Sequence, residues 1–270
     1  MRNRGLEISL AHGLNMHWRV FSASVTGQRN LEHGAAGQDA SHCVVTDDIL
    51  VAVVCDGAGS VSESRLGSDF IARALAEQLS DALRAERNLS AAHDEGGASL
   101  EAIIQSAIEA VRARLAELAD SRRLALEEFS CTLVGCVAAP GGGCFFHIGD
   151  GFAIRQGATG SSVLSRPENG EYADETYFVT DENWRAHLRL TPLPATERGA
   201  VIGLMSDGTA PFAVDRERSG FFRPFIDPIA AFLREATESN GNEALRNLLV
   251  SRRASEISAD DKTLLLAFVL

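Results

Sequence analysis

Apolar and polar residues repeat with two different periods along this chain, and the change of period marks the predicted elements. Two long stretches, 62–87 and 99–127, carry apolar residues at intervals of three or four, which is typical of amphipathic helices. Shorter apolar or alternating runs have the length and composition of strands. The predicted strands are 17–25, 43–46, 49–55, 130–139, 144–148, 152–156, 162–164, 200–205 and 262–270, and two further helices are predicted at 224–236 and 242–251.

The order of these elements predicts the fold class. The strands and helices do not alternate regularly, so a parallel sheet with crossover helices is not expected. The order instead favours an α+β fold in which antiparallel sheets pack together with helices outside. Residues 1–15 are predicted to be a weakly ordered N-terminal segment, and 16–270 to be one domain. Within that domain, 27–37 is predicted to be a loop, and about 165–198 an irregular, acidic, flap-like insert.

Composition and charge narrow the classes of function. Of the 270 residues, 45% are hydrophobic and 23% charged, which is ordinary for a globular protein. The formal net charge of −12 argues against nucleic acid and anionic lipid as partners. A phosphate site in so acidic a chain needs a local positive charge, which a bound metal ion can supply.

The cysteines and the apolar runs point to a cytoplasmic protein. The five cysteines are odd in number and no two have the CxxC spacing, so neither a zinc site nor a disulfide framework is expected. Buried, reduced thiols are the simpler interpretation. The start of the chain is too polar for a signal peptide, and no apolar run approaches the length of a membrane span.

Three Asp-Gly pairs suggest a shared site. Asp56, Asp150 and Asp207 each follow an apolar strand directly or by one residue, and each precedes a glycine. Any single pair could be a hairpin turn, for which Asp-Gly is a strong signal. However, the segments after Asp56 and Asp207 do not look like immediate return strands. Carboxylates at several strand ends can converge, where they would repel one another unless hard divalent cations neutralise them.

Two more acidic positions extend this set. Asp39 precedes the hairpin predicted at 43–55, and Asp260 with Asp261 precedes the last strand. Each could be a solvated loop acid, but the position beside a core strand favours a functional role. At the three Asp-Gly pairs, the glycine also lets the backbone approach a ligand closely, so a backbone carbonyl oxygen can become a further ligand.

Five motifs together resemble one protein family. These motifs are GQDAS at 37–41, VVCDGAGS at 53–60, GDG at 149–151, LMSDG at 204–208 and DDKTLL at 260–265. In order and spacing they resemble the motif series of type 2C protein phosphatases, most closely a bacterial branch. The resemblance implies a sandwich of two antiparallel β-sheets flanked by pairs of α-helices, with metal ions in a cleft at one end. It also places the insert at 165–198 where the family has a variable flap.

The resemblance implies a set of metal ligands. Asp56 would bridge two Mg2+ or Mn2+ ions, and the carbonyl of Gly57 would bind one of them. Asp207 and Asp260 would complete the shell of the first ion, and Asp39 would act mostly through water. Asp150, together with Asp207, would hold a looser third ion, and Asp261 would stand behind the ligands.

The implied activity is that of a metal-dependent protein serine/threonine phosphatase. A metal-bridged hydroxide would hydrolyse phosphoserine and phosphothreonine on proteins that take part in signalling, and the partner would be a serine/threonine kinase or its target. One alternative is a pseudophosphatase that docks a phosphoprotein or kinase without turnover. Another is a phosphatase for a small phosphorylated metabolite.

Two positions depart from the family pattern. Ala58 stands where better-known members carry a histidine proposed as general acid. The family also places a phosphate-binding arginine shortly before the first aspartate. Here the nearby candidates are Arg29 and His33, and neither is in clean register.

Overall fold

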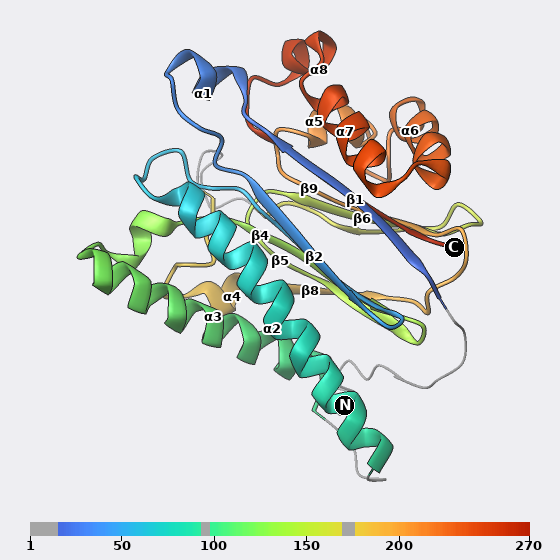
Figure 1. Cartoon of the computed structure of the whole chain (residues 1–270), viewed down its shortest axis with the longest axis horizontal. Helices are drawn as coiled ribbons and strands as arrows, with labels where there is room; N and C mark the ends of the chain where they lie inside the picture. Colours follow the sequence, from blue (N-terminus) through green and yellow to red (C-terminus); the bar gives the residue numbers. More distant parts are fainter. Residues whose placement is uncertain (1–15, 93–97, 169–175) are drawn as a thin grey trace.

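Two five-stranded antiparallel sheets form the centre of the molecule (Figure 1). The computed structural model describes residues 16–92, 98–168 and 176–270, so the predicted segment 1–15 and part of the insert lie outside the described residues. The first sheet has the order β1 (Trp18–Val25), β10 (Lys262–Val269), β9 (Val201–Met205), β6 (Phe152–Gln156) and β7 (Ser162–Ser165). The second has the order β2 (Ala40–Thr46), β3 (Ile49–Cys55), β4 (Leu133–Ala139), β5 (Gly142–Ile148) and β8 (Arg189–Leu193).

Helices cover the outer face of each sheet, which gives four layers (Figure 1). The long helices α2 (Ser64–Ala92) and α3 (Leu100–Arg122) pack on the second sheet. The helices α5 (Ala210–Ala213), α6 (Arg223–Glu235), α7 (Glu238–Leu249) and α8 (Arg252–Ile257) pack on the first. This arrangement confirms the expected α+β sandwich.

Burial on both faces explains why the central strands are continuously apolar. In β3, Val51 and Val53 pack toward the helices, whereas Leu50, Ala52 and Val54 pack between the two sheets. Strand β10 divides its side chains in the same way between the helical layer and the inter-sheet core. A strand with one face in water would alternate, but these strands have no such face.

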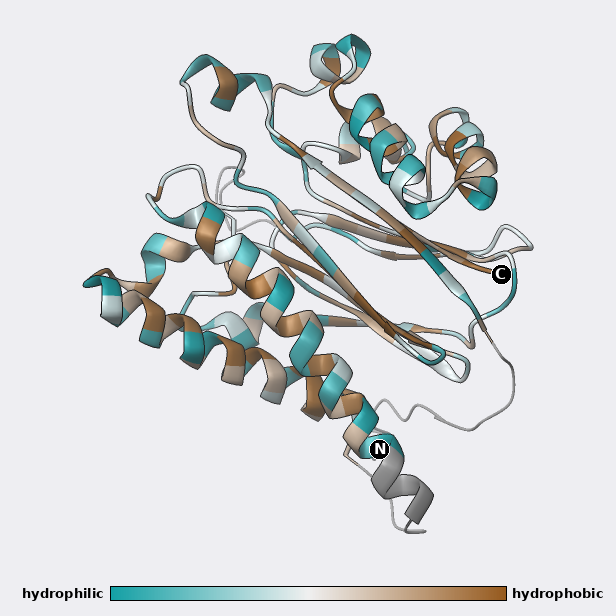
Figure 2. Ribbon diagram, in the orientation of Figure 1, coloured by the Kyte–Doolittle hydropathy of each residue, from teal (hydrophilic) through white to brown (hydrophobic). Residues whose placement is uncertain are grey.

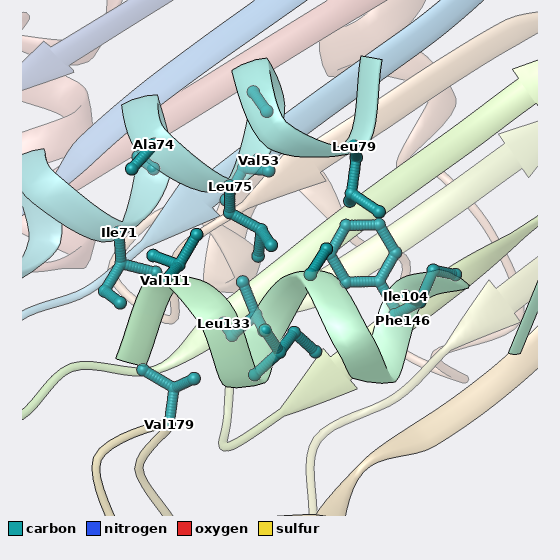
Figure 3. Close-up of a cluster of buried hydrophobic side chains, with 14 of the residues drawn as sticks. Val53, Ile71, Ala74, Leu75, Leu79, Ile104, Val111, Leu133, Phe146 and Val179 are labelled. Atoms are coloured by element: carbon teal, nitrogen blue, oxygen red, sulfur yellow. The ribbon is translucent and has the colours of Figure 1, made fainter. Parts of the chain in front are cut away.

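The helical pair is fixed by apolar stripes that face the sheet (Figure 2). Leu75 and Leu79 of α2 meet Ile104 and Val111 of α3 above the sheet, where Phe146 also lies (Figure 3). The ring of Phe146 crosses the neighbouring strand at Gly135. A Cβ atom at Gly135 would lie 1.9 Å from that ring, so this position requires glycine.

Two segments predicted to be irregular contain regular structure, and there the predictions are wrong. The segment 27–37 includes the short helix α1 (Gln28–Glu32), and the insert includes α4 (Trp184–His187) and β8. Helix α1 has five residues and no side-chain cap at its N-terminus, so it leaves no periodic signal. Strand β8 is recognisable only through its pairing with β5 at the edge of the second sheet.

Three short elements were absent from the prediction. The helix predicted at 99–127 ends at Arg122, because Arg123 takes a left-handed conformation with φ 60°, and a 3-10 turn, η1 (Leu126–Phe129), follows. Helices α5 and α8 have only four and six residues. All five cysteines are free, as expected, and in the described ranges no helix is long and apolar enough to cross a membrane.

Candidate metal centre and active site

The five predicted ligand aspartates lie at one end of the sandwich. Asp56 directly follows β3, whereas Asp150 follows β5 and Asp207 follows β9 after one intervening residue. Asp39 directly precedes β2, and Asp260 precedes β10 with one residue, Asp261, between them. Because β2 is antiparallel to β3, and β10 to β9, strand starts and strand ends meet at the same edge. The antiparallel topology therefore gathers residues that are up to 221 positions apart in the chain (260 − 39).

Four of the five aspartates line a single cavity of about 380 Å³. The cavity wall is otherwise made by residues from α1, from the segments that precede β2 and β4, from the loop after β3, and from the insert. Asp39 is not part of the wall, but it is close enough to Asp56 to raise the pKa of that carboxyl. The lining residues are Arg29, Asn30, Gln38, Asp56, Gly57, Ala58, Gly59, Thr132, Asp150, Thr176, Phe178, Asp207 and Asp260.

Three of the carboxyl groups, those of Asp39, Asp56 and Asp207, have raised pKa values because they are withdrawn from bulk water and lie close to other carboxylates. Burial raises the pKa of Asp56 well above its usual range, and repulsion from Asp39, Asp207 and Asp150 raises it further. Burial, followed by repulsion from Asp150, raises the pKa of Asp207. Burial raises the pKa of Asp39 to about 7, although the hydroxyl of Ser206 opposes that shift.

The raised pKa values make the stability of the fold depend on pH. An acid whose pKa is higher in the folded state than its unfolded value of about 4 binds its proton more tightly when folded. Its contribution to stability is present below that value and is lost as the pH rises to about 7, the folded value for Asp39. At neutral pH the cluster therefore destabilises the fold unless something else neutralises its charge.

The chemistry of the donor set fits a hard divalent cation. One carboxylate oxygen of Asp39, Oδ2, accepts a hydrogen bond of 2.6 Å from Ser206 Oγ, while Oδ1 is buried without a hydrogen-bond partner. Mg2+ and Mn2+ prefer such oxygen ligands. Over the described ranges, no three His, Cys, Asp or Glu side chains are already placed to hold one ion. Asp150 and Asp260 instead bond to protein donors, Thr176 Oγ1 at 2.8 Å and Arg29 at 3.1 Å.

Thr132 fixes the backbone at Asp56. Its hydroxyl accepts a hydrogen bond of 3.1 Å from the N–H of Asp56, and its own N–H donates one of 2.8 Å to the carbonyl of Asp56. The next residue, Gly57, lies against Gln38, where a Cβ atom would be only 2.9 Å from both the Cβ and the carbonyl oxygen of Gln38. The chain can therefore pass close to Gln38 only without a side chain at Gly57.

Comparison with known proteins decides the family. A sequence model described as protein phosphatase 2C matches residues 26–250, which is most of the chain. The chain belongs to the protein phosphatase 2C family. This confirms the expected enzyme class, a protein serine/threonine phosphatase.

One curated relative and two solved structures illustrate the likeness. The serine/threonine-protein phosphatase 3 of Escherichia coli K12 is 29% identical over 262 residues, which cover 93% of this chain and 98% of that protein. The structure of RsbX in complex with magnesium is 14% identical, with a TM-score of 0.54 over 94% of this chain and 96% of that one. The catalytic domain of the phosphatase PstP, in complex with two manganese ions, is 17% identical, with a TM-score of 0.54 over 94% and 99%. At these identities the two structures confirm the fold.

Asp261 connects three segments of the chain around the cavity. Its carboxylate accepts hydrogen bonds of 2.6 Å from the N–H of Gly27, 2.9 Å from the side chain of Asn30, and 2.6 Å from the N–H of Gln38. It thus joins the start of β10 to α1 and to the segment before Asp39. Buried Lys262 adds a hydrogen bond of 2.8 Å from Nζ to the carbonyl of Asp260.

Of the two predicted phosphate-binding residues of the phosphatase, only Arg29 lines the cavity. Helix α1 holds Arg29 at the rim, where its side chain is 66% exposed and pairs with Asp260. His33 lies outside the cavity wall, and its Nδ1 is 2.6 Å from the carbonyl oxygen of Arg29. Ala58 lines the cavity, so its wall carries no imidazole at that position.

Several residues of the site were not found from the sequence. Thr132, Thr176 and Lys262 do not stand out, because Thr and Lys are common in loops and at strand ends. Thr132 does carry one usable signal, its position directly before the strand that pairs with β3. Thr176 and Phe178, which belong to the insert, also line the cavity.

Proposed function

We propose that this protein hydrolyses phosphoserine and phosphothreonine on proteins, and that the reaction depends on Mg2+ or Mn2+ held by the aspartate cluster. One observation carries the proposal: carboxylates from both sheets converge on one cavity, where burial and the repulsion of neighbouring carboxylates raise the pKa values of Asp56 and Asp207. Such a cluster is costly at neutral pH unless cations neutralise it. The family membership, and the magnesium and manganese in the RsbX and PstP structures, support the same conclusion.

The aspartates have distinct roles in this proposal. Asp56 would hold both core ions, and the carbonyl of Gly57 would hold one of them. Asp207 and Asp260 would provide the remaining protein ligands of the first ion, and Asp39 would act through water. Asp150, together with Asp207, would hold a third ion. When bound, the cations would supply a hydroxide nucleophile at neutral pH for in-line attack on phosphorus and would offset the negative charge of the phosphoryl oxygens.

The other residues orient these groups and the substrate. Thr132 and Ser206 hold Asp56 and Asp39 in place, as described above. Arg29 is the guanidinium at the rim of the cavity, and once its bond to Asp260 is released it can bind the phosphate of the substrate. Ala58 offers no acid, so the leaving oxygen takes its proton from water.

The proposed substrate is a phosphorylated protein, either a serine/threonine kinase or its target. The second candidate function is docking of such a protein without turnover, and the absence of a histidine at Ala58 favours it. The complete set of five aspartates opposes it, because binding alone does not require a cluster that destabilises the fold at neutral pH.

Removal of metal is expected to abolish activity. The purified protein should release phosphate from a phosphothreonine peptide and from p-nitrophenyl phosphate in Mn2+, and should release none after EDTA treatment and dialysis. Activity should return when Mn2+ is added back, because the proposed reaction uses no side-chain nucleophile and depends on the ions for its hydroxide. Full turnover in a rigorously metal-free sample would exclude the metal mechanism. Peptide binding without turnover in Mn2+ would favour the docking function.

A further inference from the structure

A second cavity opens directly from the active site. Its volume is about 490 Å³, and it shares Asp150, Thr176 and Asp207 with the cavity described above. It extends toward α5 and the loop that follows that helix. Helix α5 lies on the side of the first sheet (Figure 1). Its other lining residues are Phe152, Pro167, Ala210, Pro211, Val214, Asp215, Arg216 and Arg218.

The loop that follows α5 is closed by its own hydrogen bonds. Val214 and Phe221 form an antiparallel bridge, and the N–H of Asp215 donates to the carbonyl of Gly220 at 3.0 Å. Arg218 has φ 52°, a left-handed conformation that non-glycine residues seldom adopt, and its N–H donates to the carbonyl of Asp215 at 3.0 Å. The loop therefore presents its side chains from a defined backbone.

The carboxylate of Asp215 forms its hydrogen bonds within this loop. Its carboxylate accepts hydrogen bonds from the N–H of Ser219 at 2.9 Å and from the hydroxyl of Ser219 at 2.8 Å. Its negative charge is therefore already engaged, although it lines the cavity. The other two carboxylates of the cavity, Asp150 and Asp207, are metal ligands in the proposed function.

Among the residues that the structure describes, the two arginines of the cavity have no acidic partner. Throughout the described ranges, neither Arg216 nor Arg218 forms an ion pair or a side-chain hydrogen bond. The guanidinium of Arg218 lies 5.7 Å from the ring centre of Phe152, the buried residue that starts β6 two positions after Asp150. This contact holds one positive charge beside the active site while its N–H groups stay available.

We propose that this cavity is a specificity subsite for an anionic side chain, a carboxylate or a second phosphate, on a residue that flanks the phosphorylated one. The inference rests on the proposed function, because it assumes a peptide substrate in the neighbouring site. Guanidinium groups recognise carboxylate and phosphate by paired, charge-assisted hydrogen bonds. An extended peptide advances about 3.3–3.6 Å per residue, so the anionic residue lies within a few positions of the phosphorylated one.

The test compares peptides that differ only in their flanking residues. Five phosphothreonine peptides are compared. Three have anionic flanks: one carries aspartates, one a phosphoserine on the N-terminal side, and one a phosphoserine on the C-terminal side. The other two have alanine or lysine flanks, and p-nitrophenyl phosphate serves as a substrate without flanks. The parent protein in Mn2+ is expected to show a KM about tenfold lower for the anionic peptides than for the alanine peptide, which corresponds to about 1.4 kcal/mol. Comparison of the aspartate and phosphoserine peptides identifies which anion binds better.

The variant Arg216→Gln/Arg218→Gln removes both charges and keeps side chains that can still form hydrogen bonds. It is expected to lose the preference for anionic flanks, with kcat nearly unchanged. Arg73→Gln/Arg84→Gln is the charge-matched control, because both of these arginines are exposed on α2, away from the cavity. This control should keep the preference of the parent, which separates the local contact from the change in net charge.

Three results would overturn the subsite. A parent without preference, a parent that prefers lysine flanks, or a Gln variant that keeps the preference would each exclude it. Turnover of p-nitrophenyl phosphate by all three proteins distinguishes such a result from failure of the proposed function. If the parent turns over no substrate, fluorescence anisotropy with the same labelled peptides in Mn2+ measures the preference directly.

Discussion

Replacement of Asp56 by asparagine is expected to lower phosphatase turnover by several orders of magnitude. In the proposed site, Asp56 is the one residue that contacts both core ions, so the loss of its charge removes the ligand that holds the ion pair. Asparagine keeps nearly the same shape, and the hydrogen bonds between Thr132 and the backbone of Asp56 do not depend on the side chain. Initial rates with a phosphothreonine peptide at saturating Mn2+ measure the effect.

Asp150→Asn is the matched control for this substitution. Asp150 also precedes a glycine and lines the cavity, but in the proposal it contacts only the third ion. Its replacement should reduce turnover moderately and raise the Mn2+ concentration needed for activity. If both aspartates were only turn residues, both variants would keep parental activity, because Asn-Gly forms turns as readily as Asp-Gly.

The fold of the Asp56→Asn variant provides a second control. Burial and repulsion raise the pKa of Asp56, so its ionised form destabilises the metal-free protein at neutral pH. A neutral amide removes that cost, and the metal-free variant should melt no lower than the metal-free parent. A melting temperature well below that of the parent would mean that the loss of activity reflects a damaged fold.

Deletion of residues 263–270 is expected to prevent folding. These residues form nearly all of β10, which lies between β1 and β9 and is buried along its whole length. Its removal exposes apolar side chains on both faces of the first sheet and leaves two strand edges unpaired. The truncated chain should be found in the insoluble fraction after expression.

The matched control for this deletion removes Leu270 alone. Leu270 follows β10 and is 41% exposed, so its loss should leave the protein soluble and cooperatively folded. A soluble protein that lacks 263–270 and melts cooperatively would contradict the central place of β10 in the sheet.

The sequence was sufficient to predict the parts of the fold that are buried on two faces. The strand runs 49–55 and 262–270 were recognisable because burial between a helical layer and a second sheet makes all positions but Lys262 and Thr263 apolar. The long helices were recognisable by their periodic stripes. The site was recognisable because its acids adjoin those same strands, Asp56 after β3 and Asp260 before β10.

The other parts of the fold and of the site could not be predicted, because they depend on tertiary contacts that the local sequence pattern does not reveal. Helix α1 is too short for a periodic signal, and its place is set by hydrogen bonds from Gly27 and Asn30 to Asp261, more than 230 positions away. Strand β8 depends on the exposed edge of β5. Arg216 and Arg218 acquire their proposed significance only because α5 brings their loop beside Asp150.

Calorimetric titration with Mn2+ tests the central claim, that the aspartates form a metal centre organised by Asp56. Parent and Asp56→Asn proteins are stripped of metal, shown to fold equally well, and titrated under the same conditions. The account predicts at least two bound ions in the parent and loss of the tight pair in Asp56→Asn. Equal Mn2+ binding by the two proteins, or no binding by the parent, would contradict it.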